Sequence, residues 1–317
     1  MEYYLAPLEG ITGYIYRNAY KDCFGQMDKY YTPFISPGKK CLIGPKEMRD
    51  VCIEHNQGMK LIPQILTNHA DGFVDTAKQL EQMGYTEINL NLGCPSKTVV
   101  SKHKGAGFLE DCSTLDRFLD QIFNRLTIDV SIKTRIGIEF EEEFEDLLKI
   151  YNRYPLKELI VHPRLQTDYY QGKIHKEIFA FALQESKNPV CYNGDLFTAQ
   201  DVKKLKKEYP KVQTLMFGRG IIANPFLLEE IQNEGTNIEE QIRRERLKKF
   251  HDRLVNDYDE VFQSDTPTLY KMKEIWSYLL NQFEGSQKYG KRIRKAKYLS
   301  DYKSVVEELF ASCPICQ

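Results

Sequence analysis

The sequence predicts an α/β fold, a (β/α)8 TIM barrel followed by a small C-terminal helical domain. Eight short β-rich runs alternate with helical patterns through residues 1–235, a length typical of such a barrel. From Glu239 onward only helical patterns occur. The alternative, a doubly wound open sheet, would more often carry a Gly-x-Gly-x-x-Gly turn after the first strand, where this chain has Pro7-Leu8-Glu9-Gly10.

The predicted strands are short apolar runs, rich in β-branched and aromatic residues, at 3–6, 29–35, 61–65, 87–90, 130–133, 158–161, 190–192 and 214–217. Helical periodicity between them predicts helices at 70–83, 115–126, 141–154, 176–185, 199–209 and 225–233. The segment Gly235-Thr236-Asn237 has the composition of a linker, so we place a domain boundary there, giving domains 1–235 and 236–317. The second domain has helical patterns at 239–259, 268–283 and 305–310.

The bulk composition excludes several classes of protein. With 317 residues, a formal charge of −1 and a pI near 6.6, the chain is no polycation, so a nucleic-acid partner must bind a local basic patch. The N-terminal residues resemble no secretion signal, and no apolar run approaches the roughly 18 residues of a membrane helix. Eight scattered cysteines do not resemble a disulfide framework. We therefore expect a cytoplasmic protein with reduced thiols and no membrane contact. Separately, we expect a monomer.

One cysteine stands where a barrel places its functional residues. The alternating run 87–92 ends in Gly93-Cys94-Pro95, which predicts a buried strand that stops at a tight turn. Asn91 precedes the thiol and a lysine-rich loop follows it. The residues alone leave Cys94 open as a nucleophile, a metal ligand, a general acid or a packed core residue.

Glycine-rich turns follow the last two predicted strands, as Asn193-Gly194-Asp195 and Gly218-Arg219-Gly220. Backbone N–H groups of such turns can approach phosphate oxygens closely, and barrels often bind phosphate at these two loops. Ordinary turns have similar sequences, but their joint position favours phosphate binding. We expect a phosphorylated cofactor or substrate there.

Three further polar residues end predicted strands, namely Gln64, Lys133 and His162. A lysine that ends an apolar strand needs a partner, either a nearby carboxylate or a ligand. His162 could be an ordinary rim histidine. Together with Cys94 these residues would surround one mouth of the barrel with donors that suit a flavin ring, whose reduced anion is stabilised by positive charge.

The motifs resemble those of the tRNA-dihydrouridine synthases, FMN enzymes that reduce a uridine in tRNA with electrons from NADPH. They include Ala6-Pro7-Leu8-Glu9-Gly10, Gln64, Asn89-Leu90-Asn91-Leu92-Gly93-Cys94-Pro95-Ser96-Lys97-Thr98-Val99, Ile132-Lys133-Thr134-Arg135, His162-x-Arg164, Asn193-Gly194-Asp195 and Gly218-Arg219-Gly220. The likeness is strongest to the bacterial C-type paralogue, which acts on the tRNA D-loop. Leu165 and Gly13 depart from the family, which usually has Thr and Asp at these positions.

The resemblance implies roles for individual residues. Domain 1–235 would bind FMN and catalyse, domain 236–317 would bind tRNA, and Cys94 would donate a proton to the uracil ring. NADPH would reduce the flavin first, and we expect it to use the same mouth in turn with RNA. The implied flavin contacts are Pro7, Leu8, Glu9, Gln64, Lys133 and His162, and the implied phosphate contacts are Asn193, Gly194, Asp195, Gly218 and Arg219.

The target uridine must leave its stack to reach a barrel mouth, which requires anchors on the RNA. We expect substrate contacts from Asn91, Lys97 and Arg164, with the loop 96–104 as a lid. The run 288–297 carries six cations, and we expect Lys291, Arg292 and Arg294 to contact RNA.

Two other functions fit parts of the sequence. A flavin barrel could reduce a free pyrimidine, although the basic C-terminal run would then have no purpose. A non-catalytic RNA-binding protein could keep the scaffold, although Cys94, Lys133 and the glycine turns are all intact. The pair Cys313 and Cys316 has no second ligand pair, so we predict no metal site.

Overall fold

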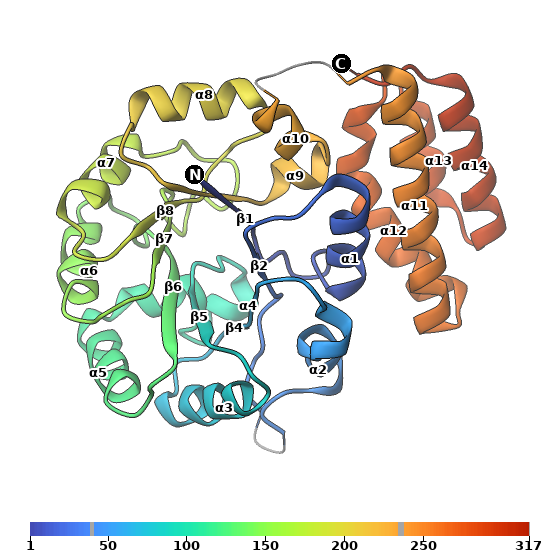
Figure 1. The fold of residues 1–317 in the computed structure, drawn as a ribbon. Helices are drawn as coiled ribbons and strands as arrows, with labels where there is room; N and C mark the ends of the chain where they lie inside the picture. Colours follow the sequence, from blue (N-terminus) through green and yellow to red (C-terminus); the bar gives the residue numbers. More distant parts are fainter. Residues whose placement is uncertain (39–40, 234–237, 317) are drawn as a thin grey trace. The chain divides into compact units, whose positions relative to one another are not determined.

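The computed structural model describes residues 1–38, 41–233 and 238–316 (Figure 1). The chain forms two compact units. The first unit comprises Met1–Pro7, Asp28–Gly194 and Lys206–Phe217, and the second comprises Leu8–Met27, Asp195–Leu205 and Gly218–Gln317. The predicted linker 235–237 lies outside the described residues. The domain boundary therefore stays a prediction.

The first unit is built on one parallel sheet with the strand order β3-β2-β1-β9-β8-β7-β6-β5-β4. Its segments are β1 (Glu2–Leu5), β2 (Lys29–Tyr31), β3 (Leu61–Ile62), β4 (Gln64–Ile65), β5 (Glu87–Leu92), β6 (Asp129–Arg135), β7 (Leu159–His162), β8 (Val190–Tyr192) and β9 (Thr214–Phe217). Only Pro63, which has no N–H to donate to a neighbouring strand, separates β3 from β4. The two ends of the order are thus one interrupted strand, and the sheet closes into the predicted eight-stranded barrel.

Helices lie outside this ring of strands, as Figure 1 shows for α3, α5, α6 and α7. The helices of the first unit are α2 (Pro45–Val51), α3 (Ala70–Gln82), α4 (Lys97–Val100), α5 (Cys112–Phe123), α6 (Glu143–Tyr151) and α7 (Lys176–Glu185), and α8 (Ala199–Glu208) runs from the second unit into the first. Each of the four long helices buries an apolar face, such as Phe73, Ala77 and Leu80 in α3. These helices confirm the predicted alternation of strands and helices.

The predicted strand end is wrong at one functional position. β6 continues two residues beyond Lys133 to Arg135, whereas β4 ends at Ile65, the last residue of the predicted strand 61–65. The prediction ended β6 at its lysine, but a strand that faces a polar barrel interior keeps its alternation through such residues. β7 does end at His162, as predicted.

The amino-terminal end of the barrel interior holds a buried ionic cluster. Lys29 Nζ lies 2.8 Å from Glu87 Oε2 and 3.9 Å from Glu158 Oε2, and the Tyr4 hydroxyl donates to Glu158 Oε1 at 3.3 Å. β1, β2 and β5 bring these groups together with the residue before β7, so the contacts cross the interior. Burial, together with Glu87 and against the attraction of Lys29, raises the pKa of Glu158 to about 7.

The second unit is helical. It contains α1 (Tyr14–Phe24), α9 (Arg219–Ala223), α10 (Leu227–Gln232), α11 (Glu240–Phe262), α12 (Asp265–Leu279), α13 (Gln287–Lys295) and α14 (Leu299–Ser312). The predicted helices do not include α1, whose Cys23 carbonyl accepts a hydrogen bond from Arg246 of α11 at 3.0 Å. Trp276, at the core of the unit, donates to the Tyr302 hydroxyl at 2.6 Å. Among the described residues no helix is both long and apolar enough to cross a membrane.

Candidate active site at the carboxyl ends of the strands

The turn after β5 holds the backbone of Cys94 from two sides. The Asn91 side-chain oxygen Oδ1 accepts hydrogen bonds from the backbone N–H groups of Gly93 and Cys94, both at 3.0 Å. On the other side Gly105 has a φ of +56°, and a Cβ atom there would lie 2.8 Å from the Cys94 carbonyl oxygen. The thiol-bearing residue, which is partly exposed, therefore has a fixed position at the strand end.

Gln64 lies beside this turn, completely buried. Its Oε1 accepts a hydrogen bond from Asn91 Nδ2 at 2.7 Å, and its Nε2 donates to Asn89 Oδ1 at 2.8 Å. The structure thus brings the predicted residues Cys94, Asn91 and Gln64 together in one hydrogen-bonded group.

Lys133 is the register partner of Asn91 across the β5–β6 pair. Burial and the repulsion of Arg135 lower the pKa of Lys133 to about 8, while Cys191 and Cys94 act in the opposite direction. Within the described part of the chain its ammonium has no hydrogen bond and no ion pair. The carboxylate partner considered from the sequence is therefore not found there, and the contact of Lys133 with a ligand stays a prediction.

His162 lies opposite Arg135 in the β6–β7 register and is nearly buried. Its Nε2 lies 3.3 Å from Arg164 NH1, and a guanidinium only donates, so Nε2 accepts and Nδ1 carries the ring proton. Arg164 is itself buried and donates through Nε to the Gly172 carbonyl at 2.8 Å. This contact fixes the loop after β7, and the role of Arg164 in binding substrate stays a prediction.

Sequence reasoning assigned no role to Arg135, although it adjoins Lys133 in the same motif. Its guanidinium is fully buried and donates to three carbonyl oxygens, those of Gly93 at 3.0 Å, Leu165 at 2.6 Å and Tyr169 at 2.5 Å. Arg135 therefore connects the cysteine turn to the loop after β7. The alternation of β6, which puts Lys133 and Arg135 on one face, was the signal that could have found it.

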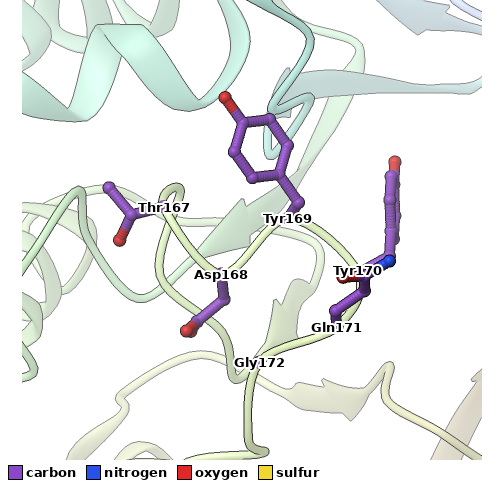
Figure 2. A pocket seen from close by; sticks show the side chains of 6 residues that line it. All are labelled: Thr167, Asp168, Tyr169, Tyr170, Gln171 and Gly172. Atoms are coloured by element: carbon purple, nitrogen blue, oxygen red, sulfur yellow. The ribbon is translucent and has the colours of Figure 1, made fainter.

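The loop after β7 forms a hollow of about 580 Å³, lined by Thr167, Asp168, Tyr169, Tyr170, Gln171 and Gly172. Figure 2 shows both tyrosine rings on one side of the loop and the Asp168 carboxyl group on the other. Asp168 Oδ2 accepts a hydrogen bond from the Leu165 N–H at 2.8 Å and lies 3.0 Å from His175 Nε2. The carboxylate therefore braces the loop while the exposed aromatic rings remain accessible.

The predicted phosphate residues fall in both units. In the first unit, Asn193 Nδ2 donates to the Met216 carbonyl at 2.8 Å, which joins the ends of β8 and β9, and Gly194 follows it. In the second unit, Gly218 precedes α9, and Arg219 NH2 lies 2.6 Å from Asp195 Oδ1. Their phosphate-binding roles stay predictions.

The predicted flavin contacts after β1 also belong to two different units. Pro7 belongs to the first unit, whereas Leu8 and Glu9 belong to the second. Within the second unit the Leu8 N–H donates to Thr12 Oγ1 at 2.8 Å, forming a compact turn before α1. Their cofactor roles stay predictions.

The family model of the dihydrouridine synthases (Dus) matches residues 4–312 of the chain. The chain belongs to this family. The match contains β5 with its cysteine turn, β6 with Lys133, and helices α11 to α13. The predicted family is therefore confirmed.

Relatives extend over most of the chain. A protein of Staphylococcus aureus (strain COL) named probable tRNA-dihydrouridine synthase is 24% identical over 316 residues, covering 97% of this chain and 92% of the relative. The tRNA-dihydrouridine(16) synthase of Pseudomonas syringae pv. tomato is 27% identical over 238 residues, covering 73% and 74%. The crystal structure of TcOYE with pHBA matches with a TM-score of 0.53 and 11% identity, covering 80% and 92%. At this identity the structural likeness shows the barrel fold alone.

In this member of the family α13 presents its cations to solvent. Lys291, Arg292 and Arg294 are exposed, whereas Tyr289 and Ile293 on the same helix are buried. The Arg292 guanidinium forms a pair of hydrogen bonds with the Glu308 carboxylate at 2.5 and 2.8 Å, so part of its charge is already neutralised. These RNA contacts stay predictions.

The segment 96–104 is compact in this structure. Lys97 is exposed at the start of α4, and the Lys102 carbonyl accepts a hydrogen bond from Asn68 at 3.1 Å. The lid role of 96–104 and the substrate role of Lys97 stay predictions.

At the other end of the chain, the Cys316 N–H donates to the Gln282 carbonyl at 2.9 Å. No group of three or more His, Cys, Asp or Glu residues suited to a metal occurs within the described ranges.

Proposed function

We propose that this dihydrouridine synthase reduces the C5–C6 double bond of a D-loop uridine in tRNA, with FMN as bound cofactor and NADPH as reductant. The observation that carries the proposal concerns Lys133, whose ammonium has no protein counter-ion in the described residues. Lys133 is the register partner of Asn91, whose side chain binds the backbone of the cysteine turn. Relatives over most of the chain are named tRNA-dihydrouridine synthases.

The residues of the first unit fit a flavin ring. Gln64 offers an amide N–H beyond the one that it donates to Asn89, Lys133 offers a cation, and His162 offers a ring whose tautomer Arg164 fixes. When bound, FMN supplies a hydride to C6 of the uracil ring, after receiving it from NADPH. Lys133 would stabilise negative charge on the cofactor, since its ammonium lies in a poorly solvated position where Coulomb attraction is strong.

Cys94 donates the proton that the reaction requires at C5. The uracil ring gains a hydride at C6 and this proton at C5, and the thiolate left behind recovers a proton from solvent. For this role Cys94 must hold its proton until the hydride arrives, so the thiol must be neutral in the enzyme–substrate complex. Asn91 and Gly105 hold the backbone of Cys94, which limits the positions that the thiol can reach.

Residues 236–317 would bind tRNA through the exposed cations of α13, while Asn91, Lys97 and Arg164 would contact the target nucleotide. We expect a monomer that acts in the cytoplasm, where tRNA and NADPH are found. The proposed roles of Pro7, Leu8, Glu9, Asn193, Gly194, Asp195, Gly218 and Arg219 are to line and hold the cofactor.

The test uses the purified full chain. We expect a yellow protein that releases FMN on denaturation and, with NADPH, forms dihydrouridine in unmodified tRNA transcripts but not in free uracil. Conversion of free uracil at a comparable rate would favour the small-pyrimidine reductase instead. Protein that binds tRNA but contains no flavin and forms no dihydrouridine would support a non-catalytic RNA-binding protein.

A further inference from the structure

Four polar side chains form a continuous hydrogen-bonded row inside the barrel. Asn91 Nδ2 donates to Gln64 Oε1 at 2.7 Å, Gln64 Nε2 donates to Asn89 Oδ1 at 2.8 Å, and Asn89 Nδ2 donates to Ser131 Oγ at 3.0 Å. The row extends from β4 and β5 to β6, so it links three neighbouring strands. Asn89 and Ser131 have no role in the function proposed above.

Backbone groups fix the direction of this row at both ends. At one end, Asn91 Oδ1 accepts from the N–H groups of Gly93 and Cys94, which can only donate. At the other end, Ser131 Oγ donates to the Ile88 carbonyl at 3.2 Å, which can only accept. Turning any one amide around would place a donor against a donor or an acceptor against an acceptor. The nitrogen and oxygen positions of all three amides are therefore determined by chemistry.

Because these side chains are buried, disrupting this hydrogen-bond pattern costs free energy of folding. Gln64, Asn89 and Ser131 are completely buried and Asn91 is nearly so, so water does not replace a lost partner. The row also leaves Gln64 with one further N–H, because only one of its two amide hydrogens goes to Asn89. The same orientation of Gln64 therefore satisfies Asn91 on one side and leaves a donor for a ligand.

We propose that Asn89 and Ser131 are positioning residues, which hold the Gln64 amide in one orientation toward the flavin and thereby hold Asn91 beneath the cysteine turn. This inference rests on the proposed function, since it assumes that Gln64 contacts the flavin. Neither residue touches the substrate or the reacting atoms. Both act through Gln64 and Asn91, from the part of the barrel interior below the site.

The variants distinguish a loss of Gln64 orientation from the general effect of removing a buried polar group. Asn89→Leu keeps the approximate size of the side chain but removes the acceptor of Gln64 Nε2. Asn89→Asp keeps that acceptor, and its carboxylate can accept from Ser131 as well. Ser131→Ala removes one hydroxyl group and leaves the Asn89 amide able to turn. Asn56→Leu is the matched control, because Asn56 is a buried amide that donates to the Asp50 and Cys52 carbonyls outside the row.

The measurements are the visible absorption spectrum of the bound flavin, the FMN affinity of the apoprotein and the melting temperature. We expect Asn89→Leu to shift the flavin absorption bands and weaken FMN binding about tenfold, with a smaller change of the same sign for Ser131→Ala. Asn89→Asp should restore most of the affinity. Asn56→Leu should lower the melting temperature without altering the spectrum.

Each outcome decides between the two proposals. If the unaltered protein binds no FMN, the proposed function is wrong. If it binds FMN and both Asn89→Leu and Ser131→Ala keep its spectrum and affinity, only the positioning role is wrong. The same spectral change in Asn56→Leu would also overturn the positioning role. Because Ser131→Ala removes a single oxygen, it keeps the test decisive should Asn89→Leu fail to fold.

Discussion

Arg135 Nε donates a hydrogen bond to the carbonyl oxygen of Gly93 at 3.0 Å, one residue before the cysteine of the turn. The same guanidinium also holds the Leu165 and Tyr169 carbonyls, and its Cζ lies 5.4 Å from the centroid of the Tyr170 ring. One buried cation thus supports two loops that border the candidate site.

Arg135→Lys should separate these loops while keeping the positive charge. A lysine cannot reproduce a planar fork that reaches three carbonyls, so we expect a loss of about 1–3 kcal/mol in unfolding free energy and roughly a tenfold lower kcat/KM. The measurements are chemical denaturation and dihydrouridine formation. Arg125→Lys is the control, because Arg125 forms an exposed ion pair with Asp71, and it should change neither quantity measurably.

Gly105→Ala should displace the cysteine turn. The new Cβ atom would meet the Cys94 carbonyl oxygen at 2.8 Å and the Cys94 Cβ at 3.0 Å, at a backbone φ of +56°. Gly84→Ala imposes a positive φ of +99° but meets nothing within 4 Å, so it isolates the backbone strain of about 1 kcal/mol. We expect both variants to lose stability but only Gly105→Ala to lose most dihydrouridine-forming activity. Equal activities would show that the turn tolerates displacement.

Lys133→Met should stabilise the apoprotein while weakening FMN binding. The pKa of Lys133 is lowered to about 8, so below pH 8 the folded chain carries a poorly solvated charge, and removing it should add about 1–3 kcal/mol of unfolding free energy. This advantage should shrink as the pH rises from about 8 to 10.5, because the wild-type lysine then loses its proton. A stability difference that stays constant over this range would contradict the account.

Glu158→Gln should remove the pH dependence of folding stability that arises at the amino-terminal end of the barrel. The raised pKa of about 7 means that folding favours the protonated carboxyl, so its stabilising contribution is complete below about pH 4.5 and is lost as the pH rises to 7. At pH 8 the amide should be more stable than the carboxylate by about 1–3 kcal/mol, with no decline between pH 4.5 and 7. Thermal melts across this range provide the measurement, with the exposed Glu185→Gln of α7 as control.

Neutralising α13 should weaken tRNA binding without releasing FMN. Changing Lys291, Arg292 and Arg294 to Gln should reduce affinity at least tenfold and flatten its salt dependence, since fewer counterions are released. Arg292→Gln alone should cost less than Lys291→Gln, because Glu308 already neutralises Arg292. Lys78→Gln, an exposed change on α3, is the control, and unchanged tRNA affinity in the triple variant would exclude this surface.

The alternation of short strands was sufficient to predict the closed barrel, and the residues at strand ends indicated Cys94, Gln64 and His162. The same alternation, continued along the strands in both directions from Asn91 and Lys133, would have placed Asn89, Ser131 and Arg135 on the interior face. The partners of these residues were not predictable, because each hydrogen bond joins different strands or loops. Arg164 shows this limit, since only the folded loop reveals that its guanidinium holds the Gly172 carbonyl.

The central claim is that Cys94 donates the proton at C5 of the uridine. In a single turnover, pre-reduced enzyme is mixed with excess unmodified tRNA, and dihydrouridine formation is followed for Cys94→Ala and for Cys52→Ala, which alters a second partly exposed thiol. We predict that Cys94→Ala binds tRNA normally but forms dihydrouridine at least a hundredfold more slowly, a factor typical of a lost general acid, while Cys52→Ala keeps the wild-type rate. A wild-type rate in Cys94→Ala would contradict the account.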